Sequence, residues 1–129
     1  MSRPFVLLAA LYGFLGVALG AFAAHGLRHS LAAELLAVFQ TGVLYQLIHA
    51  LALLGVGVLA LRWRTRFLLA SGVLFAVGVV LFSGSLYALT LSGWRVGMVT
   101  PVGGLCLLSG WLCLGISAWK AMSLSPSSS

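Results

Sequence analysis

Few side chains in this sequence could take part in chemistry, and His49 is the foremost of them. Tyr45 and Gln46 precede it by four and three residues, so all three share one face of a helix. A histidine beside a phenol and an amide could bind a ligand or carry a proton. It could also stay neutral and donate one hydrogen bond to a neighbouring helix, an interaction that contributes roughly 0.6 kcal/mol within a membrane. Both interpretations stay open. We favour the second, and the neighbouring Tyr45 and Gln46 are what support the first.

The reactive combinations that common enzymes use cannot form from this sequence. Glu34 is its only carboxylate side chain, so it holds neither paired carboxylates nor a Ser-His-Asp set. Cys106 and Cys113 lie about 10.5 Å apart along a helix, too far for a disulfide and without a metal-binding spacing. A bis-histidine haem site would need His25 and His49 at one depth, yet helix rise separates them by more than about 10 Å. We therefore predict no enzyme activity, no metal and no cofactor.

The elements that position these residues follow from the placement of charge. All eight charged residues lie at the ends of four uncharged runs, at 4–27, 35–61, 67–94 and 96–119. A helix needs roughly 20 apolar residues to cross a hydrocarbon core about 30 Å thick, so each run can cross once. Charged residues make up only 6% of the chain, too few to cover a soluble domain. No alternating pattern of a β-barrel is present. The sequence predicts an all-α membrane protein, a bundle of four transmembrane helices.

The predicted organisation is a single transmembrane domain over residues 1–122, followed by a disordered tail at 123–129. The four spans are expected at about 4–24, 37–61, 67–91 and 100–122. Ser30 is expected to cap the second helix, and Thr100, followed by Pro101, the fourth.

The signs of the charges predict the orientation. Four crossings place the N-terminus, the 62–66 loop and the C-terminus on one side of the membrane. That side carries five basic residues and the other side carries two. The first set is Arg3, Arg62, Arg64, Arg66 and Lys120, and the second is Arg28 and Arg95. The positive-inside rule then puts both termini in the cytoplasm of a bacterial inner membrane. Because the charges bracket helices instead of gathering on one surface, we do not expect nucleic acid to bind.

With this orientation, most polar side chains of the spans fall in their outer halves. We predict that they line a polar pocket that opens outward. The candidate residues are His25, Gln40, Thr41, Tyr45, Gln46, His49, Ser83, Ser85, Tyr87 and Thr100.

Glycines at helical spacing predict close contacts between helices, as at the GxxxG pair of Gly16 and Gly20. The candidate packing residues are Gly13, Gly16, Gly20, Gly84, Gly103 and Gly104.

Four short motifs resemble those of a known family. Residues 20–27 read GAFAAHGL, similar to the GAFGAHGL signature that ends the first helix of the YgdD-like family, domain of unknown function 423. Segments 39–50, 81–87 and 100–104 resemble its other motifs, in order and one to a helix. The departure is Ala23 where glycine is usual, a small-for-small change. The resemblance implies a small inner-membrane protein with four transmembrane helices, and it brings no established activity.

The function expected from these features is that of a structural or accessory protein that docks on, or helps to assemble, a larger membrane complex. One alternative is a small transporter or channel, which could be a homo-oligomer. Another is a lipid- or quinone-binding protein whose pocket includes His25, Tyr45, Gln46, His49 and Tyr87. Membrane lipids are the partners that every alternative shares.

Overall fold

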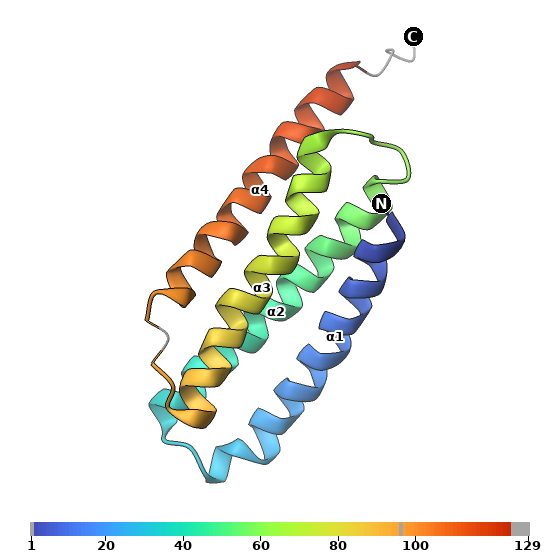
Figure 1. Cartoon of the computed structure of the whole chain (residues 1–129). Helices are drawn as coiled ribbons and strands as arrows, with labels where there is room; N and C mark the ends of the chain where they lie inside the picture. The colour runs from blue at the N-terminus through green and yellow to red at the C-terminus, as the bar shows by residue number, and fades with distance from the viewer. Residues whose placement is uncertain (1, 96, 125–129) are drawn as a thin grey trace.

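The computed structural model describes residues 2–95 and 97–124 of the chain, and they form four long helices (Figure 1). The helices are α1 (Ser2–His25), α2 (Ala33–Leu59), α3 (Arg66–Ser92) and α4 (Val99–Leu124), with a short 3-10 helix η1 (Leu27–His29) after α1. The described residues contain no strand. All four helices are long and apolar enough to cross a membrane. The prediction of an all-α protein with four transmembrane helices is confirmed.

The helix ends differ from the sequence-based expectation at two caps. Ser30 does not cap α2, since its N–H bonds the carbonyl of Leu27 and closes η1 instead. The chain can leave α1 in this short turn because the Leu27 side chain is buried. Thr100 is already inside α4 and therefore cannot be its N-cap. At the other end α4 continues to Leu124, so the predicted tail loses its first two residues to the helix, and residues 125–129 lie outside the described part of the chain.

The helices pack chiefly as two neighbouring pairs. α1 packs along α2 and α4 along α3, and the α2–α3 contact joins the pairs. In Figure 1, α2 and α3 lie between α4 on one side and α1 on the other, and both ends of the chain are at the same end of the bundle. α1 and α4 consequently leave most of their surface open to the surrounding lipid.

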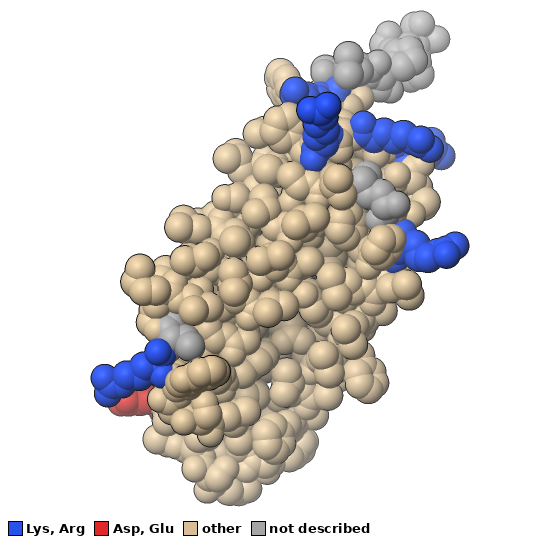
Figure 2. Space-filling model, in the orientation of Figure 1, with Lys and Arg blue, Asp and Glu red and all other residues tan. Residues whose placement is uncertain are grey.

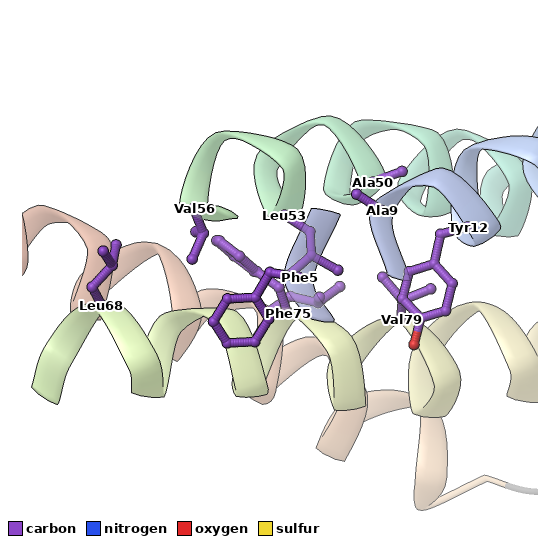
Figure 3. Packing of buried hydrophobic residues seen from close by; sticks show 10 residues of the cluster. Phe5, Ala9, Tyr12, Ala50, Leu53, Val56, Leu68, Phe75 and Val79 are labelled. Carbon is purple, nitrogen blue, oxygen red and sulfur yellow. The ribbon is translucent and has the colours of Figure 1, made fainter. Parts of the chain in front are cut away.

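One apolar core joins the four helices. Phe5 of α1, Leu53 of α2, Phe75 of α3 and Leu107 of α4 are all buried in it. Figure 3 shows the Phe5 and Phe75 rings close to Leu53. Phe75 fits because α4 presents Gly110 to it, where an added Cβ would lie 2.7 Å from the ring.

Four of the six candidate packing glycines lie at contacts with another helix, namely Gly16, Gly20, Gly103 and Gly104. Gly103 lies against the α3 backbone itself, since an added Cβ would lie 2.8 Å from the Leu81 carbonyl carbon and closer still to the Phe82 backbone nitrogen. Gly13 and Gly84 have no atom of another helix within 4 Å of such a Cβ, so the structure places them away from close helix contacts. Tight contacts also occur at glycines that spacing did not single out, at Gly42, Gly57, Gly72, Gly78 and Gly110.

Charge is confined to the two ends of the bundle. Figure 2 shows lysine and arginine side chains gathered at the end that holds the termini, and a smaller group beside the single acidic residue at the other end. The surface between them carries no charged side chain in this view, as the hydrocarbon region of a membrane requires.

Candidate functional site

Gln46 is the centre of a hydrogen-bond network that joins three helices. Its side chain, 4% exposed, lies halfway along α2. The Tyr87 hydroxyl of α3 donates to Gln46 Oε1 at 2.6 Å, and Gln46 Nε2 donates to the Tyr12 carbonyl of α1 at 2.9 Å. The Tyr12 hydroxyl in turn donates to the Ala76 carbonyl at 2.7 Å. An amide can serve both neighbours at once because it carries a donor and an acceptor.

Serine and threonine hydroxyls form further links between helices. Ser83 donates to the Gly42 carbonyl at 2.7 Å, and Ser85 lies 2.6 Å from the Thr100 hydroxyl. Among the described residues, no buried side-chain nitrogen or oxygen lacks a hydrogen-bond partner. The buried polar atoms are therefore already occupied by the protein itself, as a low-dielectric interior demands.

His49 uses both ring nitrogens within the protein. Its Nδ1 lies 2.7 Å from the Tyr45 carbonyl, and Nε2 accepts from the Trp111 indole N–H at 3.0 Å. An indole N–H can only donate, so Nε2 must be the acceptor and the proton belongs on Nδ1, which donates to Tyr45. The partners thus assign a neutral ring, and a second proton on Nε2 would have to displace the Trp111 hydrogen bond.

Aromatic rings surround this histidine. The centroids of Phe75 and Trp111 lie 5.5 and 5.8 Å from that of His49, and the Tyr45 ring stacks at 6.1 Å. Trp111 was not among the candidate residues. The signal that could have found it is its depth, since tryptophan usually lies at a membrane interface and Trp111 is in the middle of its span.

The structure places the ten candidate pocket residues in different surroundings. Three of them, His25, Gln40 and Thr41, are exposed, and the Thr41 hydroxyl bonds back to the Ala37 carbonyl of its own helix. Six belong to the contacts described above: Gln46, His49, Ser83, Ser85, Tyr87 and Thr100. The tenth, Tyr45, is 39% exposed. Sequence gives the depth of a residue in its span, but the facing of the helices decides which residues meet.

Two apolar grooves mark the outside of the bundle. The α2–α4 groove, about 540 Å³, is lined by Tyr45, His49, Phe82, Pro101, Gly104, Leu105, Leu107, Leu108 and Trp111. The α1–α2 groove, about 510 Å³, is lined by Val6, Ala9, Ala10, Gly13, Val17, Leu47, Ala50, Leu51 and Leu54. The described residues contain no cluster of three metal-ligating side chains, and Cys106 and Cys113 are free thiols.

The amino-acid sequence matches a known protein family. The family model described as "Protein of unknown function (DUF423)" matches residues 19–104. The chain belongs to this family. The resemblance seen in the sequence motifs is confirmed, and no solved structure matches the chain.

Its relatives in the DUF423 family are bacterial membrane proteins of similar length. A UPF0382 membrane protein of Haemophilus influenzae is 45% identical over 96% of this chain and 100% of its own. The UPF0382 inner membrane protein YgdD of Escherichia coli is 46% identical over 91% of this chain and 90% of its own. A UPF0382 membrane protein of Staphylococcus saprophyticus is 40% identical over 92% and 98%. With its four apolar helices, this DUF423 protein is a multi-pass integral membrane protein, of a family whose activity is unknown.

Proposed function

We propose that the protein is a non-enzymatic accessory or assembly partner of a larger membrane complex, and that the α1–α2 groove receives a transmembrane helix of that complex. The observation that carries the proposal is the unfilled space at Gly13. Ala9, Ala10 and Gly13 form a strip of small residues on α1, and no atom of another helix lies within 4 Å of a Cβ added at Gly13. Small residues let two helix backbones approach closely, and in lipid the gain comes from van der Waals packing.

The composition of the groove supports a helix as its occupant. Its nine lining residues offer no polar side chain, so a partner from the aqueous phase would find nothing to bind. The large side chains at its edge, such as Leu51 at 71% exposure, project outward and could interdigitate with an apolar helix.

The hydrogen-bond pattern favours this role over a transporter or channel. To transport a polar solute, side chains inside the membrane must give up hydrogen bonds to the protein and form them with the solute instead. Here Gln46, Tyr87 and His49 are engaged with other helices, and the single carboxylate side chain, Glu34, lies at the start of α2.

For the location, we propose the bacterial inner membrane with both termini in the cytoplasm. The sequence places five basic residues toward the end of the bundle that holds the termini and two toward the other end. Figure 2 shows most of the basic side chains in view at the first end. The positive-inside rule supports this orientation, and the printed name of the Escherichia coli relative supports the inner membrane.

Site-specific photo-crosslinking at native expression tests the proposal. A benzophenone side chain at Leu51, in the groove, should give an adduct with another membrane protein. The same probe at Val80, on α3 and 58% exposed, should not. Gly13→Leu fills the groove and should abolish the adduct, whereas Gly84→Leu, a glycine with equally open surroundings outside both grooves, should leave it unchanged. Adducts with lipid alone, or only with a second copy of this chain, would contradict a role as partner of another complex.

A further inference from the structure

One end of the α2–α4 groove, at Tyr45 and Trp111, lies near the depth of the bilayer centre. Tyr45 and Trp111 are each about 18–21 Å from the two ends of their helices, at 1.5 Å rise per residue. A hydrocarbon core about 30 Å thick therefore places both rings near its midplane. The groove continues from Trp111 to Pro101, about 15 Å along α4, so it is longer than a single ring.

The groove offers flat aromatic surface beside aliphatic side chains. Tyr45 and Phe82 contact each other with ring centroids 4.6 Å apart, and Trp111 lines the groove with them. Leu105 and Leu108, both well exposed, continue the lining toward the start of α4. Gly104 leaves room beside the Phe82 ring, since a Cβ there would meet this ring only at 3.9 Å.

One polar group of the groove is not engaged by the protein. The His49 ring nitrogens and the Trp111 N–H are bonded to each other and to the Tyr45 carbonyl. Tyr45 itself makes ring contacts, and no described residue hydrogen-bonds its hydroxyl. A hydroxyl near the midplane of a membrane has no water to bond and gains from any acceptor that reaches it.

We propose that the α2–α4 groove binds a bilayer-soluble ring compound that carries a carbonyl, of the quinone class. The ring packs against Tyr45, Phe82 and Trp111, and the Tyr45 hydroxyl donates a hydrogen bond to the carbonyl. An apolar chain on the ring follows Leu105 and Leu108. His49 is a positioning residue, which holds the Trp111 indole at the groove wall.

Depth distinguishes this ligand from a phospholipid. Ester carbonyls accept the same hydrogen bond, but they lie at the edge of the hydrocarbon core, about 15 Å from its midplane. A ring compound dissolved in the acyl-chain region reaches Tyr45 without deforming the bilayer. The α1–α2 groove shares no lining residue with this site, so the inference is independent of the accessory role proposed above.

Tryptophan fluorescence in nanodiscs provides the test. Replacing the other three tryptophans (Trp63→Phe, Trp94→Phe, Trp119→Phe) leaves Trp111 as the only reporter. Titration with decylubiquinone, a quencher, should give saturable loss of Trp111 emission. Tyr45→Phe should shift the half-saturation concentration upward by about three- to tenfold, the loss of one hydrogen bond. Gly104→Leu should abolish saturation, and Gly115→Leu, on the same helix with open surroundings, should not.

The choice of lipid in the nanodisc distinguishes a quinone carbonyl from the ester carbonyls of phospholipids. Affinity should be the same in nanodiscs of ester-linked and of ether-linked phospholipid, because ether lipids carry no carbonyl. Binding that appears only in the ether lipid would assign the groove to phospholipid esters and overturn the proposal. Linear quenching that is alike in all variants would show simple partition into the bilayer and would also overturn it. Circular dichroism and a single monodisperse elution peak confirm that each variant is folded.

Discussion

At the scale of single residues, the polar groups inside the bundle act mainly as cross-links. Gln46 bonds α1 through the Tyr12 carbonyl and α3 through the Tyr87 hydroxyl, and His49 bonds α4 through Trp111. Each such hydrogen bond contributes only roughly 0.6 kcal/mol in a membrane, but an unpaired polar atom left behind costs more. These side chains therefore specify which helix faces meet.

Replacing Gln46 should destabilise the bundle. Gln46→Leu removes the acceptor of the Tyr87 hydroxyl and the second hydrogen bond of the Tyr12 carbonyl, so we expect a loss of about 1–2 kcal/mol in the free energy of unfolding. Gln40→Leu is the matched control, the same change on an exposed site of the same helix. Reversible unfolding in mixed micelles measures both. Equal losses in the two variants would show that the network does not contribute.

The His49–Trp111 hydrogen bond should appear as coupling between the two residues. In a double-mutant cycle of His49→Phe and Trp111→Phe, we expect an interaction free energy of about 0.5–1.5 kcal/mol. The unfolding free energies of the wild type, both single variants and the double variant supply it. Additive effects within error would contradict the hydrogen bond.

At the scale of the helices, packing depends on where glycine removes a side chain from a contact. Gly103 lets α4 approach the α3 backbone itself, and Gly110 receives the Phe75 ring. The α3–α4 pair is further fixed at its end near the chain termini by Thr65. Its hydroxyl accepts from the Leu68 N–H as the N-cap of α3 and lies 2.5 Å from the Ser117 hydroxyl of α4.

Two adjacent glycines offer a sharp test of the α3–α4 contact. Gly103→Ala places a methyl group against backbone atoms that cannot rotate away, so we expect a loss of about 1–3 kcal/mol in unfolding free energy. Gly104→Ala makes only an ordinary contact with the Phe82 ring and gains helix propensity, so it should be neutral or stabilising by up to about 1 kcal/mol. Thermal unfolding in detergent measures the stability of both variants. If Gly104→Ala were less stable than Gly103→Ala, the α3–α4 contact at Gly103 would be contradicted.

At the scale of the whole molecule, the arrangement combines a satisfied interior with unfilled grooves outside. The central helices α2 and α3 contribute most of the buried residues, nine and ten against five in α1. The apolar surfaces of α1 and α4 remain available to lipid, to another helix or to a bilayer-soluble molecule. A hydrogen-bonded interior with open apolar grooves outside is the arrangement expected of a membrane protein that binds partners through its lipid-facing surface. The charged residues at both ends of the bundle favour a fixed depth in the bilayer.

The charge difference between the two ends should set the orientation. Because we expect the C-terminus in the cytoplasm, green fluorescent protein fused to it should fluoresce. Alkaline phosphatase, which is active only outside the cytoplasm, should be inactive at the same position. Replacing Arg62, Arg64 and Arg66 by asparagine leaves two basic residues on each side, so a mixed orientation is expected. Fusions that report a single unchanged orientation would show that these arginines do not determine it.

The sequence by itself determined the number of helices, their ends to within a few residues, and the family. Those properties depend on one-dimensional patterns, namely the spacing of charges against the bilayer thickness and four ordered motifs. The short turn at Leu27–His29 departed from the expected cap because a buried leucine, and no local capping signal, fixes it.

Only the tertiary structure decided which polar residues meet. Tyr12 and Trp111 were not among the candidate residues, yet they are the hydrogen-bond partners of Gln46 and His49. His25 and Gln40 were candidates, yet both are exposed. A uniformly apolar helix gives no amphipathic stripe to show which face is buried, so rotation about the helix axis cannot be derived from the sequence. In lipid that rotation is set by packing at glycines and by pairing of polar atoms, both of which are properties of two helices together.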